Sequence, residues 1–233
     1  MTDTYVIAST RLWDTARTQQ LATKTDDKFV FIGGSDELTI EYVSRIKPRY
    51  IFFPFWSDRI DKQIYETTEC VIFHMTDLPY GRGGSPLQNL IIRGILDTKI
   101  SAIRCAEEID AGPIYLQKDF NLQGPAHEIL ERAAVLIESM ILEIIQTQPS
   151  PVPQVGAATA FKRRKPSESN LNLANSIGQV YDMIRMLDAS DYPKAFLELE
   201  KFRLEFRNAH ISDDQVQAEV SIVFSDQIDG KSN

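Results

Sequence analysis

The segment CVIFHMTDLPYGRGGSP, residues 70–86, joins an apolar run to one of the three histidines of the chain and then to a loop rich in Gly and Pro. The run ends at His74, and an imidazole can exchange protons near neutral pH. A single histidine on an apolar strand is more often a core residue bonded to a backbone carbonyl, so His74 alone does not define a site. The glycines that follow would let the backbone lie against a flat heterocyclic ligand.

A second polar turn, IDAGPI, spans residues 109–114 and offers a carboxylate that could act with this imidazole. The order Asp-Ala-Gly-Pro is also ordinary turn chemistry, which by itself would explain Asp110 without any reaction. Considered together with the loop after His74, a carboxylate at Asp110 could orient the imidazole and favour its charged form.

Short β-branched and aromatic runs alternate with helix-length segments over the first hundred residues. Continuous apolar strands separated by helices predict an α/β fold, with a mostly parallel twisted sheet covered by helices on both faces, as in Rossmann-like proteins. Ligands of such sheets bind at the carboxyl ends of the strands, where His74 is expected. The strand candidates are residues 5–9, 29–34, 49–55 and 70–74, followed by 99–105 and 113–120 at an antiparallel or mixed edge; the helix candidates are 11–24, 36–46, 57–68 and 86–96.

The carboxyl-terminal part is expected to form a small α+β appendage. Residues 126–146 have the apolar spacing of a helix with one broad buried stripe, and the proline-rich tract after them cannot continue that helix. A further helix over 180–188 and a small hairpin over 196–211 are predicted, and the apolar side chains of the hairpin exceed what two strands can bury. They should pack on the main domain or on a second subunit, as in a homodimer. The expected domains are 1–148, a linker over 149–160, and 161–233.

The composition limits the kinds of partner. The chain has 233 residues, 43% of them hydrophobic, and a formal net charge of -8, which disfavours nucleic acid as a main partner. Cys70 and Cys105 are too few for a disulfide framework, and no Cys/His cluster has the spacing of metal ligands. The absence of a long apolar stretch predicts no membrane partner and a cytoplasmic location.

The loop after His74 resembles the signature of the 10-formyltetrahydrofolate-dependent formyltransferases, in which Asn-x-His is followed by Ser-Leu-Leu-Pro, then Arg-Gly and Pro. The IDAGPI turn resembles the second signature of that family, an Asp-x-Gly turn whose acid is Asp110. The resemblance implies a formyltransferase fold, catalytic roles for His74 and Asp110, and 10-formyltetrahydrofolate as the cofactor, with tetrahydrofolate as product. The matching or adjacent positions implied to bind the folate are Thr76, Asp77, Leu78, Pro79, Gly81, Arg82, Gly83 and Ile109, and Pro86 also falls in register.

Thr76 stands where the family often has Ser, and one further departure from the family pattern bears on the reaction. Ile72 stands where the family has the asparagine that donates a hydrogen bond to the formyl oxygen, and an isoleucine cannot donate. Either another donor supports the oxyanion, such as a loop amide, Asn89 or His74 itself, or the chain has lost activity. The amino-terminal part is also shorter than in most relatives.

The segment after the linker resembles that of the sugar N-formyltransferases. This resemblance implies that the acceptor is the primary amine of a nucleotide-linked amino sugar in the synthesis of a surface polysaccharide, of the pseudaminic acid type. Arg163 and Arg164 would meet its phosphates with forked donors, and Asn89 would also bind the substrate. Glycinamide ribonucleotide or methionyl-tRNA formyltransferase is the alternative enzyme, and a catalytically silent folate-binding protein is the non-enzymatic alternative.

Overall fold

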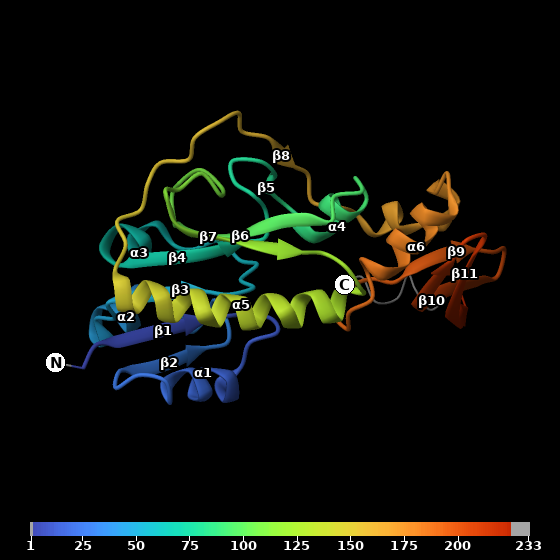
Figure 1. Ribbon diagram of the computed structural model, residues 1–233. Coiled ribbons are helices and arrows are strands. Elements are labelled where there is room, and N and C mark those ends of the chain that lie inside the picture. Colours follow the sequence, from blue (N-terminus) through green and yellow to red (C-terminus); the bar gives the residue numbers. More distant parts are fainter. Residues whose placement is uncertain (1, 225–233) are drawn as a thin grey trace. The chain divides into compact units, whose positions relative to one another are not determined.

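The structure is a computed structural model, and it describes residues 2–224. Residues 225–233 of the expected carboxyl-terminal part lie outside this range. Figure 1 labels the α-helices and β-strands of the chain. In chain order the elements are β1 (Thr4–Ala8), α1 (Thr15–Ala22), β2 (Lys28–Ile32), α2 (Ile40–Ile46), β3 (Tyr50–Phe53), α3 (Lys62–Thr67), β4 (Glu69–His74), β5 (Arg82–Gly83), α4 (Pro86–Ile91), β6 (Asp97–Arg104), β7 (Ile114–Asn121), α5 (Ala126–Thr147), β8 (Ala160–Phe161), the 3-10 turns η1 (Pro166–Ser169) and η2 (Leu171–Leu173), α6 (Ile177–Arg185), β9 (Ala195–Glu198), β10 (Phe202–Ser212) and β11 (Gln215–Phe224).

The chain forms two compact units, each built from segments that are separate in the sequence. The first contains the residues up to Gly83 together with Thr98–Phe120 and Leu130–Ala160. The second contains Gly84–Asp97, Asn121–Ile129 and the described residues from Phe161 onward. The α5 helix contributes its first residues to the second unit and the rest of its length to the first.

The first unit is built on a six-stranded sheet with the order β2-β1-β3-β4-β6-β7. The β1, β2, β3 and β4 strands pair in parallel, whereas β6 runs antiparallel to β4. This confirms the mostly parallel sheet with a mixed edge that the sequence predicts. The chain crosses from β2 over β1 to β3, so the loops at the carboxyl ends of β1, β3 and β4 converge on one edge, which is where ligands bind in such sheets.

Both faces of this sheet are covered, which explains why its strands read as continuous apolar runs. Val6 of β1 and Phe53 of β3 lie in one cluster with side chains of α2 and α3, among them Val43 and Ile64. The alternate residues of β1 and β3 are equally buried, and α5 lies along the sheet in Figure 1. No helix within residues 2–224 combines the length and the apolar character needed to cross a membrane.

The α4 helix is shorter than expected, because it ends at Ile91 rather than near residue 96. Gly94 adopts a left-handed φ of 72°, and its amide bonds back to the carbonyl of Ile91 while that of Ile95 bonds to Leu90. These two bonds form a Schellman motif, which closes the helix even though the apolar pattern continues beyond it.

The second unit contains a three-stranded antiparallel sheet with the order β11-β10-β9. The β9 and β10 strands form the hairpin expected over residues 196–211. The β11 strand was not expected; it pairs along β10 after a tight turn, with Ser212 opposite Gln215. The rings of Phe202 and Phe224 meet across these two strands at 4.9 Å between centroids.

Candidate functional site

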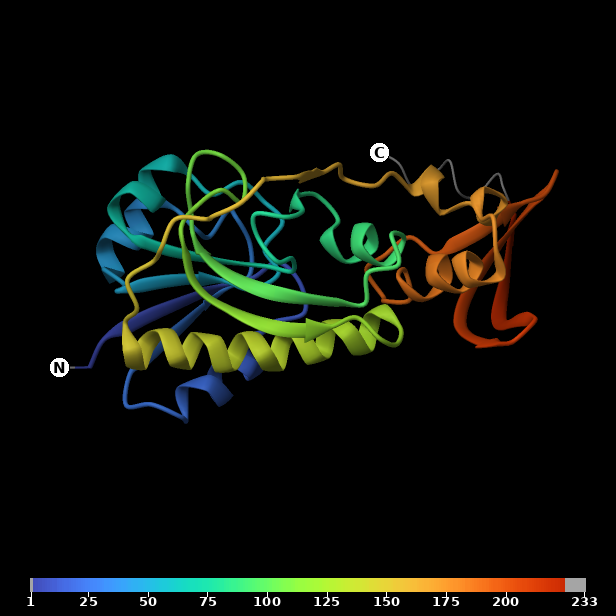
Figure 2. The ribbon, with the colours of Figure 1, turned by 45° about the horizontal axis from the view of Figure 1, so that its top comes forward.

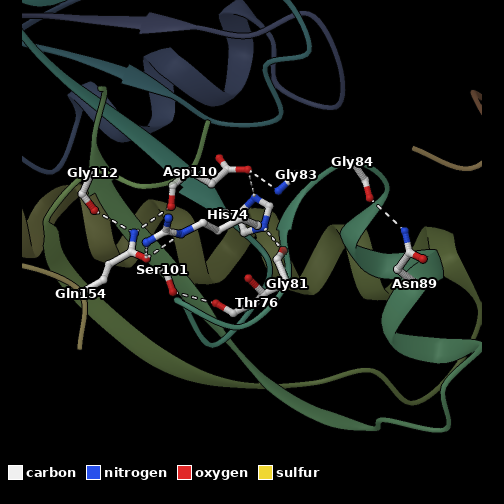
Figure 3. A network of polar contacts seen from close by, with 11 residues as sticks. His74, Thr76, Gly81, Gly83, Gly84, Asn89, Ser101, Asp110, Gly112 and Gln154 are labelled. Atoms are coloured by element: carbon white, nitrogen blue, oxygen red, sulfur yellow. Dashed lines mark hydrogen bonds and ion pairs between the residues drawn. The ribbon is translucent and has the colours of Figure 1, made fainter. Parts of the chain in front are cut away.

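His74 ends β4 in the first unit, and its imidazole lies between two oxygen atoms (Figure 3). Its Nε2 is 2.8 Å from the carbonyl oxygen of Gly81, and its Nδ1 is 3.4 Å from Oδ2 of Asp110. A carbonyl oxygen only accepts hydrogen bonds, so Nε2 holds a proton in this arrangement. Only the doubly protonated imidazolium could donate to Gly81 and to Asp110 at once. The side chain is 7% exposed, so this pairing is largely shielded from water.

Asp110 reaches His74 from the turn between β6 and β7. Its Oδ2 also accepts a hydrogen bond of 2.8 Å from the backbone N–H of Gly83, so the carboxylate ties the imidazole to the following loop. Asp110 has a left-handed φ of 54°, which Asp tolerates better than most residues. A side chain at Gly112 would place its Cβ 1.8 Å from the carbonyl oxygen of Arg104, so only glycine fits there. The Asp-x-Gly pattern therefore has a steric reason in this fold.

The loop between His74 and β5 is held from the far side by Thr159, which precedes β8. The Thr159 Oγ1 accepts a hydrogen bond of 2.8 Å from the Gly81 amide, and its backbone bonds to Arg82 and to the Pro79 carbonyl. Gly83 has a φ of 97°, which favours glycine. The Gly81 carbonyl that meets His74 is thus fixed by contacts that do not involve the imidazole.

The residues implied to bind folate lie together in this unit. Thr76 is fully buried, and its Oγ1 has no hydrogen-bond partner among the described residues. Its carbonyl accepts a hydrogen bond of 2.7 Å from Ser101 Oγ. Asp77 forms an ion pair with Lys99, and Ile109, next to Asp110, is 72% exposed. An exposed apolar side chain and a buried hydroxyl with spare bonding capacity fit a flat ligand that has polar edges.

The residues implied to bind the acceptor belong to the second unit, where most of their polar groups already have partners. Asn89 Nδ2 donates hydrogen bonds of 2.9 Å to the carbonyls of Gly84 and Lys162. Arg164 donates to the carbonyl of Glu168 from Nη2, whereas its buried Nε has no partner among residues 2–224. Burial lowers the pKa of the Arg164 guanidinium from its ordinary value. The backbone of Arg163 packs against Gly84 so closely that a Cβ there would come within 2.6 Å of it.

Ile72 lies two residues before His74 on β4 and therefore projects from the same face of the strand. It is partly buried against the cluster shared with α2 and α3, and it pairs with Phe53 of β3 and Ile103 of β6. The position where the family has an asparagine is thus part of the apolar core. The alternative donors expected from the sequence, the Asn89 amide and the loop N–H groups, already have acceptors within the chain. These loop groups are the N–H groups of Tyr80, Gly81, Arg82 and Gly83.

The sequence reading missed two residues of this network, Thr159 and Gln154. Both follow α5 in the proline-rich stretch that was expected to be a linker. Figure 2 shows the chain between α5 and β8 as an extended segment. A polar residue directly after the last of three prolines was the available signal at Gln154, but the sequence does not show which residues lie opposite its side chain.

Comparison with known proteins relates this geometry to a family. The solved structure of methionyl-tRNA formyltransferase from Clostridium thermocellum is 45% identical, with a TM-score of 0.92 over 96% of this chain and 100% of that one. The chain belongs to the formyltransferase family. Residues 166–223 match the family model of the methionyl-tRNA formyltransferase C-terminal domain.

Other formyltransferases are more distant. The curated methionyl-tRNA formyltransferase of Thermodesulfovibrio yellowstonii is 25% identical over 72% of this chain and 58% of its own length. A sugar N-formyltransferase structure from Shewanella is 15% identical, with a TM-score of 0.70 over 91% of this chain and 99% of that one, which shows the shared fold alone. The expectation that the chain most resembles the sugar enzymes is therefore not supported, because methionyl-tRNA formyltransferase is much more similar in sequence. The net charge of -8 was a poor guide to the acceptor, because it sums the charges of the whole chain and does not show how they are distributed.

The formyltransferase chain spans between 52% and 62% of the length of the first curated relatives that it matches. The family uses 10-formyltetrahydrofolate, which agrees with the cofactor expected from the sequence. The exposed Ile109 and the unpartnered Thr76 hydroxyl fit such a folate, because a pteridine has apolar faces and a polar rim.

Proposed function

We propose that this formyltransferase moves the formyl group of 10-formyltetrahydrofolate to a primary amine, and that methionyl-tRNA provides the amine. The observation that supports the reaction is the pairing of a buried imidazole with a carboxylate, at 3.4 Å, beside a glycine-rich loop. The observation that supports the acceptor is the 45% identity to a methionyl-tRNA formyltransferase over nearly the whole chain.

The proposed chemistry assigns a separate role to each member of the pair. The bound folate supplies an activated formyl carbon. His74 takes a proton from the attacking amine and returns one to the leaving amine, as general acid-base catalysis by a positioned imidazole requires. Asp110 accepts from Nδ1 and sets the orientation of the ring. Because Nε2 now donates to the Gly81 carbonyl, it can accept a proton only after substrates replace this contact and the neutral ring carries its proton on Nδ1, facing Asp110.

The folate is proposed to lie against the loop from Thr76 to Gly83 and against Ile109. The buried Thr76 hydroxyl would complete its hydrogen bonding with a polar edge of the ligand, and Ile109 would cover an apolar face. Asp77, Leu78 and Pro79 shape the same loop, and Arg82 joins it to the Asp110 turn through side-chain contacts described below.

A basic run, Lys162–Lys165, lies immediately before the region that matches the C-terminal domain of methionyl-tRNA formyltransferases. We propose that Arg163 and Arg164 meet phosphate groups of the acceptor, since guanidinium groups bind phosphate with paired donors. The unpartnered Arg164 Nε supports this role. A local basic segment of this kind can bind a polyanion although the whole chain has a net charge of -8.

A nucleotide-linked amino sugar remains the second candidate acceptor, and the acidity of the chain favours it. A net charge of -8 opposes a large polyanion more strongly than it opposes a small nucleotide. The same pair of arginines would then meet a pyrophosphate. Formylation of glycinamide ribonucleotide has no observation that favours it over these two.

The test compares acceptors under single-turnover conditions with 10-formyltetrahydrofolate in each reaction. Methionine-charged initiator tRNA, nucleotide amino sugars with different bases, and glycinamide ribonucleotide are each incubated with the chain, and formylated product is measured by mass spectrometry. Formylated product from the charged tRNA alone supports the proposal. Formylated product from a nucleotide amino sugar alone would show that the sugar, and not methionyl-tRNA, is the acceptor. Folate binding without product from any acceptor would identify a catalytically silent relative. The His74→Asn variant is the control for uncatalysed transfer.

A further inference from the structure

Gln154 connects parts of the site that are far apart in the sequence (Figure 3). Its Nε2 donates hydrogen bonds of 2.7 Å to the Asp110 carbonyl and 2.9 Å to the Gly112 carbonyl. Its Oε1 accepts from Nε and Nη2 of Arg82, at 3.1 and 2.8 Å. One amide thus uses both donors and its oxygen, and all its partners lie in the Asp110 turn or at the start of β5.

The backbone that presents Gln154 is fixed independently of these contacts. Val152 and Ile114 exchange two backbone hydrogen bonds, of 2.7 and 2.9 Å, at the beginning of β7. Proline residues at positions 149, 151 and 153 restrict the preceding chain to extended conformations. The side chain therefore extends from a fixed point toward the turn.

The Asp110 turn needs such support, because its conformation is unfavourable. Asp110 has a left-handed φ of 54°, a region that residues other than glycine seldom adopt without external contacts. The Gln154 amide donates to the carbonyls of the residues on either side of Ala111, and this pair of hydrogen bonds spans the turn. If these bonds were lost, relaxation of the turn would move the carboxylate away from His74.

We infer that Gln154 is a positioning residue that keeps the Asp110 carboxylate in place against Nδ1 of His74. This inference deepens the proposed function, and the expected effect of Gln154 on catalysis rests on that function. The expected effect of Gln154 on the position of the carboxylate is independent of it, because the contact between carboxylate and imidazole can be observed without any reaction. Gln154 itself touches neither His74 nor the reacting atoms in this account.

Two substitutions separate the two sides of the amide. Gln154→Leu removes the donors to the turn and the acceptor for Arg82. Gln154→Glu keeps oxygen atoms for Arg82 but, when ionised, can no longer donate to the two carbonyls. Val155→Ala, at the neighbouring residue that is 87% exposed, is the matched control.

The first measurement is ¹⁵N NMR of the histidine side chains in the full chain at fixed pH. The His74 resonances are assigned as those that disappear from the spectrum of the His74→Asn variant. The chain has three histidines, so the spectrum is simple. In both Gln154 variants we expect the Nδ1 resonance of His74 to shift, because Nδ1 faces Asp110. The Nε2 resonance should stay unchanged, because its partner, the Gly81 carbonyl, is held in place by Thr159 and not by Gln154. Val155→Ala should leave both unchanged.

Three outcomes would overturn the inference in variants with native circular dichroism: an unchanged Nδ1, a shift in Gln154→Leu but not in Gln154→Glu, or equal shifts of both nitrogens. The second would show that Arg82 is the partner that matters, and the third would show a general loss of structure. If the native chain transfers formyl groups, both variants should also lose roughly tenfold to a hundredfold in kcat with little change in KM. A native chain without transfer activity would refute the proposed function and leave the NMR test valid.

Discussion

Replacing Ile72 with Asn restores the family residue at the signature position that would support the oxyanion. We expect the change to cost stability and to alter transfer activity less than tenfold. Ile72 packs against the apolar cluster and pairs with Phe53 and Ile103 on the neighbouring strands. An amide placed there loses apolar contacts and has no obvious partner among these side chains.

The magnitudes follow from the degree of burial. Truncation of a fully buried Ile costs about 2–5 kcal/mol, and Ile72 is only partly buried, so the lost packing should cost roughly 1–2 kcal/mol. An unsatisfied amide adds about 1–3 kcal/mol where water cannot reach it. If instead the new amide reached the formyl oxygen and supplied a missing donor, kcat would rise by roughly 10²- to 10³-fold.

The assay is single-turnover formyl transfer by the native chain, Ile72→Asn and Ile72→Val, on whichever acceptor the native chain formylates. Chemical denaturation of the same three proteins gives their stabilities. Ile72→Val controls for lost packing, since it removes one methylene and adds no polar group. A gain of about a hundredfold or more in Ile72→Asn alone would refute the reasoning, because it would show that nothing has replaced the family donor.

His74→Asn and Asp110→Asn should each lower kcat by at least about a hundredfold with native circular dichroism, because they remove the proton carrier and the charge beside it; near-normal turnover in either would contradict the pairing. Burial raises the pKa of Cys105 to about 11 and that of Cys70 further, so neither thiol should react with an alkylating reagent at pH 8 until the chain unfolds. The Cys105 thiol should stabilise the fold fully below its unfolded pKa of about 8.5, and this contribution should fall as the pH rises toward 11, as denaturation at several pH values would show. Ile222 on β11 is 69% exposed, so we expect the chain to form a dimer at micromolar concentration in light scattering and Ile222→Ser to weaken it, whereas equal monomer masses would argue against an interface there.

The amino-acid sequence was sufficient to predict the α/β class and the carboxyl-end position of His74. Continuous apolar strands bounded by turn residues are a local signal, and the edge at which parallel strands present their ligands follows from topology. The pairing of His74 with Asp110 was also accessible, because the two motifs occur in a fixed order in a family that the sequence resembles. The catalytic roles of both residues remain predictions.

Where the sequence reading failed, the deciding contacts join residues distant along the chain. The end of α4 depended on a glycine that adopts a left-handed conformation, a choice that the apolar pattern around it does not show. The β11 strand was not predicted because its alternation of apolar and polar residues is a weak signal in the sequence. The strand is stabilised by its pairing with β10, which only the folded structure shows.

The proline-rich stretch after α5 shows most clearly what only the tertiary structure decided. Its composition predicts an extended linker, and the chain there is indeed extended. Its attachment to β7, and the three hydrogen-bonding groups that Gln154 directs at Asp110, Gly112 and Arg82, depend on where the chain passes in space. A side-chain amide has the same donors and acceptor in any sequence context, so its role depends on the partners that folding brings within about 3 Å of it.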